Sequence, residues 1–472
     1  MPTSRREFLR NASAYAAGFA GLRAFVHPSA AIASVATAVD PGYGELVADA
    51  AGLLDLPAGF SYRVISRTGD VMDDGLLVSA APDGMATFPG PDGTTVLVRN
   101  HETKPGMAGP FGENNERYGK IAADRLYDDG DGITPGVGGT TTLVYDTREQ
   151  RVVRQFQSLA GTERNCAGGP TPWGSWITCE ETMDRPGELG DPEDSFTVTK
   201  EHGYCFEVPA TADAKLADPV PLVAMGRMRH EAVAVHPASG AVFETEDIDD
   251  GAFYRFLPTT PGKLAEGGRL QALVVRGKPS LDTRNWGEQP SVAVGDRFEV
   301  DWIDLDEPES PNDDLRYRAF DAGAARFARG EGIWWVDGDA EAGSIYFACT
   351  SGGTKRIGQI WKYTPSPGEG EAGECANAGV LELFLEPNDS RLIENADNLT
   401  AAPWGDLVVC EDRYDEDVRL VGVTPEGRCY TLARNHVRGE FAGVTFSPDG
   451  STLFVNLQTA GMTLAITGPW RS

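Results

Sequence analysis

The chain has 472 residues and carries 71 acidic against 41 basic side chains, which gives a formal charge of −30. A field of this sign repels nucleic acids and anionic membrane surfaces, so we expect no nucleic-acid partner and an affinity for cations. The length suits one large β barrel or propeller. Its 56 glycines and 31 prolines favour short strands joined by tight turns. The predicted fold class is all-β.

The first segment of the chain has the pattern of an export signal. Arg5 and Arg6 are followed by Phe8 and Leu9, an apolar stretch and small residues, as in twin-arginine signal peptides. We predict a signal peptide over 1–38, recognition by the twin-arginine export machinery, and a periplasmic or extracellular mature domain over 39–472. The apolar stretch contains Arg23 and is shorter than the ~20 residues of a membrane span, so no stable membrane insertion is expected. Because this route exports folded proteins, it favours a metal cofactor loaded in the cytoplasm.

Seven cysteines follow, at positions 166, 179, 205, 349, 375, 410 and 429. Since the number is odd, at least one thiol stays unpaired within the chain even in an oxidising compartment. Up to three disulfides could join the others, and the sequence does not select the pairs.

A turn closed by glycine and followed by an apolar strand recurs along the chain. The clearest copies follow Gly174, Gly240, Gly405 and Gly450, and weaker copies follow Gly93 and Gly343. Six such copies predict a β-propeller of about six blades with long inter-strand insertions.

Acidic residues occupy the same place in several of these copies. The sixth residue after the turn glycine is Glu180, Glu246, Glu411 or Asn456. In a propeller equivalent strand ends meet at one mouth, so we expect the three glutamates to converge there and to bind hard cations, which prefer oxygen ligands. The alternative is that they are solvated loop residues.

The most specific stretch of the sequence runs from Asn165 to Gly174 (NCAGGPTPWG) and continues into Glu180 and Glu181. Matching stretches lie elsewhere, at 100–102, 138–142, 229–232, 244–247, 329–332, 395–399 and 456–458. Together they resemble the PhoX-type alkaline phosphatases over nearly the whole mature chain.

This resemblance implies a propeller that carries a pair of iron ions with neighbouring calcium ions and hydrolyses phosphate monoesters outside the cytoplasm. It implies that Cys166 is the thiolate ligand of iron and that Glu231 and Glu331 are carboxylate ligands. Calcium would take Glu180, Glu246, Asp397 and Glu411. Arg329 would hold the phosphate, and the catalytic set would be Arg329, Glu331 and Glu231.

The residue types agree with these roles. A thiolate suits a transition metal and carboxylates suit calcium, although Cys166 could instead be a buried structural cysteine or a disulfide partner. Arginine matches a phosphate through its planar fork of donors, although Arg329 could instead belong to a surface salt-bridge cluster with Arg326 and Glu331. His230 could be a metal ligand or a general acid, but the apolar residues 232–235 that follow it predict a strand and favour a histidine in the core or one that supports a ligand. The sequence lacks a Gly-x-Ser-x-Gly elbow and a phosphate-binding loop, which favours metal-activated water or an oxo species over a protein nucleophile.

One departure from the family pattern concerns the substrate. The resemblance implies a phosphate-binding lysine upstream of Asn165, but no lysine lies between Lys120 and Lys200, and Ser158 stands in that place. Arg164 or Arg154 could replace it. Two other hypotheses therefore stay open: a calcium-dependent propeller lactonase or diesterase, and a non-catalytic binding propeller.

Overall fold

The computed structural model describes residues 39–190, 195–287, 289–338 and 343–471. The predicted signal peptide over 1–38 lies outside this part. The described chain is mostly β-structure, as predicted, and its one α-helix is α3 (Leu315–Asp321). Among the residues described, no helix combines the length and the apolarity needed to cross a lipid bilayer.

Five antiparallel sheets form the body of the molecule, and a small hairpin lies beside them. The first sheet contains β4 (Pro82–Pro89), β5 (Thr95–His101), β6 (Gly139–Asp146) and β7 (Arg151–Ala160). The second contains β8 (Asn165–Pro170), β9 (Ser175–Glu180) and β12 (Cys205–Pro209). The hairpin is β10 (Gly187–Leu189) with β11 (Phe196–Val198).

The third sheet has nine strands in the order β13-β14-β15-β16-β17-β21-β20-β19-β18. Its strands in chain order are β13 (His230–Val235), β14 (Val242–Glu246), β15 (Phe253–Pro258), β16 (Gly268–Val275), β17 (Arg297–Asp304), β18 (Gly330–Val336), β19 (Ser344–Cys349), β20 (Gln359–Thr364) and β21 (Val380–Leu385). Because its end strands β13 and β18 also contact each other, the sheet is nearly closed like a barrel.

The last two sheets join the two ends of the described chain. One contains β22 (Ala396–Ala401), β23 (Leu407–Glu411), β24 (Arg419–Val423), β25 (Cys429–Asn435), β2 (Leu54–Pro57) and β1 (Leu46–Val47). The other contains β26 (Phe441–Phe446), β27 (Thr452–Leu457), β28 (Met462–Thr467) and β3 (Ser61–Arg67). Since β3 pairs with β28, an N-terminal strand completes the C-terminal sheet.

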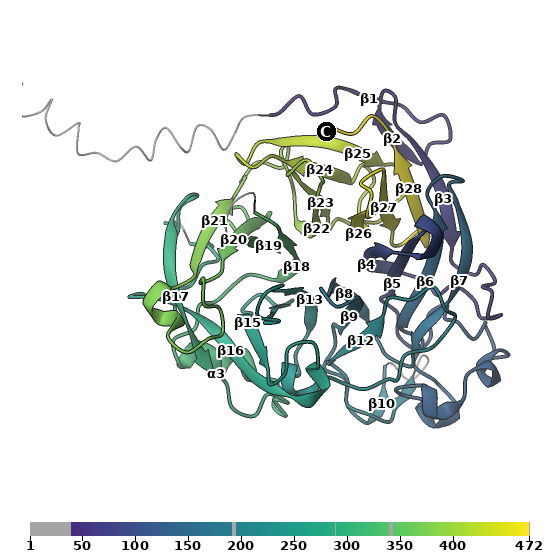
Figure 1. The fold of residues 1–472 in the computed structure, drawn as a ribbon, viewed down its shortest axis with the longest axis horizontal. Helices are drawn as coiled ribbons and strands as arrows, with labels where there is room; N and C mark the ends of the chain where they lie inside the picture. The colour runs from purple at the N-terminus through teal and green to yellow at the C-terminus, as the bar shows by residue number, and fades with distance from the viewer. Residues whose placement is uncertain (1–38, 191–194, 288, 339–342, 472) are drawn as a thin grey trace, which may run out of the picture.

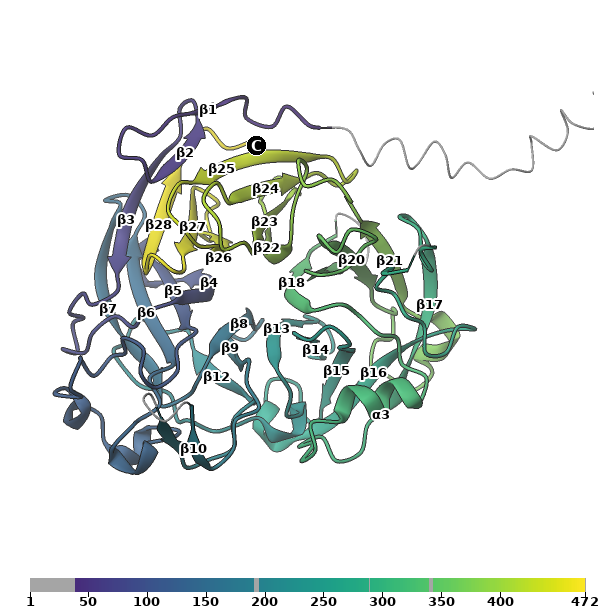
Figure 2. The ribbon, with the colours of Figure 1, turned by 180° about the vertical axis from the view of Figure 1, so that it is seen from behind.

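Six strands surround the middle of the molecule. In chain order they are β4, β8, β13, β18, β22 and β26, each contacts the next, and β26 contacts β4. Figures 1 and 2 show these strands around the centre with the remaining strands of each sheet outside them. The six turn-and-strand copies in the sequence correspond to the second strands β5, β9, β14, β19, β23 and β27, so these strand predictions are confirmed.

The inner strands share one irregularity near their N-terminal ends. In each, two residues of the inner strand face one of its partner, as where Asn165 pairs with Glu180 and Gly168 pairs with Thr178. The same shift occurs in the other five inner strands. A β-bulge of this kind kinks the strand and re-aims the side chain at the bulge.

Small residues let the inner strands approach one another closely. A Cβ atom on Gly84 in β4 would lie 2.5 Å from the Cα atom of Ala167 in β8, and one on Gly332 would lie 2.6 Å from the Cα atom of Asn398. The cavity between the six strands has a volume of only about 20 Å³ here, and residues of all six strands line it. The centre is therefore packed, and polar side chains gather at the bulged end.

Candidate metal centre

The bulges of the inner strands carry the candidate ligands. The first residue inside each bulge is Asp83 in β4, Cys166 in β8, Glu231 in β13, Glu331 in β18 and Asp397 in β22. In β26 it is Gly443. Because the bulges occupy equivalent places in six strands that contact one another in a ring, they bring five metal-binding side chains to one end of the molecule.

A second set of acids follows the neighbouring strands. Glu102, Glu181, Asp247 and Asp412 come directly after β5, β9, β14 and β23, and Glu440 directly precedes β26. Burial and the charge of Asp247 raise the pKa of Glu181 and Glu331, and burial and the charge of Asp412 raise the pKa of Asp397 and Glu440, so the two sets lie close together. We call the two sets together the mouth cluster: Asp83, Glu102, Cys166, Glu181, Glu231, Asp247, Glu331, Asp397, Asp412 and Glu440.

Ligand atoms of the mouth cluster lie within coordination range of one another in three overlapping groups. The groups are Asp83, Glu102 and Cys166; Cys166, Glu181 and Glu231; and Glu231, Glu331 and Asp397, each with its atoms within 4.8 Å. Cys166 belongs to two groups and so does Glu231. The thiol therefore lies between carboxylates in a continuous array that has room for more than one ion.

Mutual repulsion and burial disfavour the charged forms of this array in the protein alone. Burial, together with Glu102 and Asp397, raises the pKa of Asp83 well above its usual value. Burial and Asp412 raise the pKa of Asp397 to about 8. The pKa values of Glu181, Glu231, Glu331, Glu440 and the Cys166 thiol are raised for the same two reasons. A bound cation would remove the repulsion and restore the charged forms.

The residues fit metal ions on a second ground. Glu231 is fully buried, and neither of its carboxylate oxygens has a hydrogen-bond partner. A buried carboxylate without partners is costly, since the lost hydration is not replaced. Cys166 is similarly short of partners, with its Sγ atom 3.8 Å from Oδ2 of Asp83. Carboxylate oxygens and a thiolate form a donor set for divalent or trivalent ions, which supply the missing interactions.

Two arginines at the mouth oppose the negative charge. Arg329 donates to both oxygens of Asp247 at 2.8 and 2.9 Å and to Glu331 at 2.7 Å, and it also reaches Asp412 at 3.3 Å. Its side chain remains 32% exposed. Arg164 lies 3.6 Å from Glu102 with its side chain 38% exposed. Both guanidinium groups are thus held beside the carboxylates and accessible from solvent.

The structure places the predicted residues in two different environments. It brings Cys166, Glu231, Glu331 and Asp397 together, with Arg329 beside them. It does not bring Glu180, Glu246 and Glu411 to a common point. Their side chains bind separate cationic partners, which are His202 for Glu180 at 2.7 Å, Arg316 for Glu246 at 3.3 Å and Arg419 for Glu411 at 3.0 Å.

The prediction that these three glutamates converge is therefore wrong by one position in the sequence. The side chains that meet are those of the next residues, Glu181, Asp247 and Asp412, because neighbouring side chains in extended chain point in opposite directions. Counting residues from the turn glycine finds the end of the strand but not which face of it points to the mouth.

The alternatives for the missing lysine are also separated. Ser158 is buried in β7 and lies 2.8 Å from the hydroxyl of Thr140, and Arg154 donates to the carbonyl of Ala212 outside the mouth cluster. Arg164 alone of these three lies beside a mouth carboxylate. Arg326 stacks on the ring of Phe320 and takes no part in the Arg329 network.

The sequence did not single out six acids of the mouth cluster as ligands. They are Asp83 and the five acids of the second set, Glu102, Glu181, Asp247, Asp412 and Glu440. One signal was available for Asp83. It is followed by Gly84, as Glu231 is followed by Ala232 and Glu331 by Gly332, and an acidic residue before a small one marks the bulge in each of these strands.

All seven cysteines lie in the described part of the chain, and none is in a disulfide. Cys166 is therefore free for metal binding, and the prediction that at least one thiol is unpaired holds. His230 is fully buried beside Glu244, away from solvent, which agrees with its reading as a core histidine.

A ring of β-strands with a thiol and clustered carboxylates at one end defines a class of β-rich protein that can hold metal ions. The family comparison makes this specific. The model of the family "Alkaline phosphatase PhoX" matches residues 41–144 and 132–461, so the chain belongs to the PhoX family and is a phosphatase. No curated protein is detectably similar in sequence.

One solved structure supports the fold. PhoX from Pseudomonas fluorescens, solved in complex with vanadate, a transition state analogue, is 17% identical with a TM-score of 0.63, over 88% of this chain and 96% of that chain. A gluconolactonase from Xanthomonas campestris is 14% identical over 91% of this chain and 99% of that chain, with a TM-score of 0.35. The second likeness is too weak to bear on function.

Proposed function

We propose that the protein is an exported PhoX phosphatase that hydrolyses phosphate monoesters at the mouth cluster, with iron and calcium ions as cofactors. The observation that carries the proposal is the array of three overlapping ligand groups, in which the Cys166 thiol lies between carboxylates and Glu231 has no other partner. The vanadate held by the Pseudomonas fluorescens protein supports a phosphate-containing substrate.

The donor types suggest how the ions divide. A thiolate favours a transition metal over calcium, so we assign iron to Cys166 with Glu231 and Glu331. Calcium takes oxygen ligands from several directions, which suits Asp397 together with the acids that follow the second strands, Glu181, Asp247 and Asp412. Glu180, Glu246 and Glu411 are less suited, because each already binds an arginine or histidine.

The protein side chains would bind and orient the substrate. Asp247 holds the Arg329 guanidinium at two points, and the Nη1 nitrogen, whose one contact is the long one to Asp412, can donate to a phosphate oxygen. Arg164 would add a second positive charge in place of the family lysine. Glu231 and Glu331 hold the metal side of the site, and the metal ions when bound neutralise phosphate charge and acidify water. The two arginines then stabilise the charge that grows on the transferred group.

The finer architecture and location belong to the same proposal. We assign the ring of six inner strands to a six-bladed β-propeller formed by one domain over 39–472, with each inner strand opening a blade. The twin-arginine pattern around Arg5 and Arg6 supports export by that machinery to the periplasm or the extracellular space. The −30 charge is consistent with a partner that is a small phosphate compound together with cations.

Hydrolysis of a chromogenic phosphate monoester tests the proposal. We expect turnover by protein purified from its exporting host, loss of turnover on chelation, and recovery only when iron and calcium are both returned. Elemental analysis should find both metals. Absence of phosphate release from a fully metallated preparation across a panel of phosphoesters would refute the activity. Recovery with calcium alone would refute the iron assignment.

A further inference from the structure

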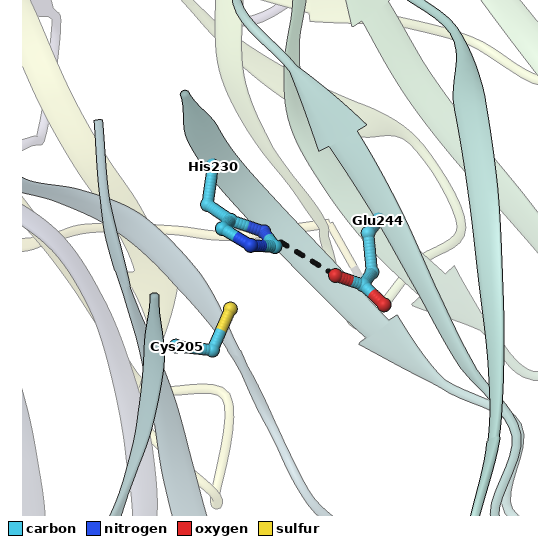
Figure 3. Close-up of side chains that lie close together, drawn as sticks. All are labelled: Cys205, His230 and Glu244. Atoms are coloured by element: carbon cyan, nitrogen blue, oxygen red, sulfur yellow. Dashed lines mark ion pairs between the residues drawn. The ribbon is translucent and has the colours of Figure 1, made fainter. Parts of the chain in front are cut away.

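A second group of metal-binding side chains lies away from the mouth cluster, between two sheets. It consists of Cys205 at the start of β12, His230 at the start of β13 and Glu244 in β14. One ligand atom from each lies within 4.8 Å of the others, and all three residues are fully buried. Figure 3 shows the thiol and the imidazole on one side of the group and the carboxylate of Glu244 facing the ring.

The polar atoms of this group lack ordinary partners. Neither carboxylate oxygen of Glu244 has a hydrogen bond, and neither does Nδ1 of His230, although Nδ1 lies 3.3 Å from Oε2 of Glu244. A proton on Nδ1 would offset one carboxylate oxygen at most and would leave Oε1 buried and unsatisfied. Buried polar atoms in this number require a compensating group.

The imidazole is oriented as in a metal site. Nε2 of His230 lies 3.1 Å from the carbonyl oxygen of Gly226 and donates its proton there. In the neutral imidazole that bond leaves Nδ1 without a proton, so its lone pair is available to a cation, 3.3 Å from Oε2 of Glu244. A histidine that binds a metal through one ring nitrogen usually donates from the other to a carbonyl or carboxylate, which sets the tautomer.

A second thiol stands next to the group. Cys179 in β9 is paired in register with Cys205 in β12, and their Sγ atoms are 3.6 Å apart. Two sulfurs bound tetrahedrally to one zinc ion lie about 3.8 Å apart, because each Zn–S bond is about 2.3 Å long. The nitrogen and oxygen ligands of such an ion lie about 3.4 Å apart, close to the 3.3 Å between Nδ1 and Oε2.

We propose that Cys205, His230 and Glu244 hold a structural zinc ion, and that the Cys179 thiol, which contacts Cys205 from outside the 4.8 Å group, closes the site as the fourth donor. The donor set of two sulfurs, one nitrogen and one oxygen suits zinc rather than calcium, which takes oxygen ligands. Binding would release the thiol protons, and the bound cation would offset two of the three negative charges on the thiolates and the carboxylate. The two cysteines come from the second sheet and the other two ligands from the nine-stranded sheet, so the ion would join neighbouring sheets.

The position of the site gives it a structural consequence for the mouth. His230 is followed directly by Glu231, and both lie at the bulge of β13. An ion that fixes His230 would therefore hold the backbone that presents Glu231 to the mouth cluster. The zinc assignment itself does not depend on whether the mouth holds iron or on which phosphoester is cleaved.

Metal analysis of four variants and the wild type tests the site. We expect one zinc ion per wild-type chain, and an affinity for zinc that falls by at least about tenfold in Cys205→Ser and in the milder Glu244→Gln. Cys166→Ser, at the mouth, should keep the zinc. Cys429→Ser, which removes a buried thiol from β25, is the matched control and should keep it too.

X-ray absorption at the zinc edge, measured on the Cys166→Ser protein, reports the zinc ligands without any substitution among the four proposed ligands. Sulfur at about 2.3 Å and nitrogen or oxygen at about 2.0–2.2 Å are expected. The proposal is overturned if the wild type holds no zinc, if Cys205→Ser retains it, or if Cys179 and Cys205 are found joined as a disulfide in non-reduced peptide maps. Metal-free protein with both thiols reduced would instead indicate a buried ion pair between His230 and Glu244, and would equally overturn it.

Discussion

Glu411 and Asp412 are neighbours in the chain and lie in opposite environments. Glu411 is fully buried and bound by Arg419, whereas the Asp412 side chain is 25% exposed and faces Asp397, Glu440 and Arg329. Glu246 and Asp247 differ in the same way. The first acid of each pair has a cationic partner of its own, whereas the second shares Arg329 with other acids in a cluster with excess negative charge. Charge that the protein does not compensate marks the place where a ligand binds.

The outer acids behave as structural links between strands. His202 connects Glu180 to Asp128 through its two ring nitrogens, at 2.7 and 3.3 Å. Burial opposes protonation of this histidine, but the two carboxylates overcome that effect and raise its pKa to about 10. The imidazole is therefore charged at neutral pH, and the link is an ion pair that needs no metal.

The largest expected effect is a loss of activity when an acid of the mouth cluster is replaced, compared with an acid bound by an arginine. Glu231→Gln should lower phosphomonoesterase kcat by more than about 100-fold, because it removes a carboxylate shared by two ligand groups of the mouth. Glu246→Gln should keep most of the activity, since Glu246 binds Arg316 and Tyr254 instead. Steady-state kinetics with elemental analysis measures both. Equal losses in the two variants would contradict the division.

Stability should respond in the opposite order. Glu411→Gln should lower the free energy of unfolding by about 3–5 kcal/mol, because it leaves the largely buried Arg419 without its carboxylate. Asp412→Asn should change the same quantity by less than about 1 kcal/mol, since it loses one half-exposed contact. Urea unfolding of the metal-free variants provides the measurement, and a larger loss in Asp412→Asn would refute the distinction.

The metal-free protein should lose stability as the pH rises. Asp397 has a pKa of about 8 in the folded protein against about 3.9 when unfolded, so the folded state binds the extra proton between these values. Stability should therefore fall from pH 5 to pH 8 by at least about 1.4 kcal/mol, the equivalent of one pKa unit. Unfolding with saturating iron and calcium is the control and should lack this slope. A metal-free protein more stable at pH 8 than at pH 5 would contradict the prediction.

The smallest effect concerns Arg164. Arg164→Ala should raise KM for a phosphate monoester by about tenfold, equivalent to about 1.4 kcal/mol, with a smaller change in kcat. The physical reason is the loss of a solvent-accessible guanidinium beside Glu102. Arg154→Ala is the matched control, because its guanidinium donates to Ala212 away from the mouth. An unchanged KM in Arg164→Ala would show that Arg164 does not replace the missing lysine.

The strand ends could be predicted from the sequence, and the mouth only in part. Turn glycines such as Gly174 and Gly405 predict the strands that follow them, because these turn positions have a positive φ, which glycine adopts readily. The resemblance carried by the stretch around Cys166 named one thiol and three acids that the structure brings together in the cluster, Cys166, Glu231, Glu331 and Asp397. Asp83 has only the weaker signal of an acid followed by glycine, and Glu440 has none in a single sequence.

Composition, turn chemistry and the motif around Cys166 are local properties, and they were enough to determine a mostly β protein of the PhoX family with an acidic metal centre. The tertiary structure decided which acid of each pair faces the mouth. That choice depends on the register of the strands and on bulges shared by six strands far apart in the chain, because a shift of one residue turns every side chain to the other face. The same folding placed Cys205, His230 and Glu244 together, which no spacing in the sequence predicts.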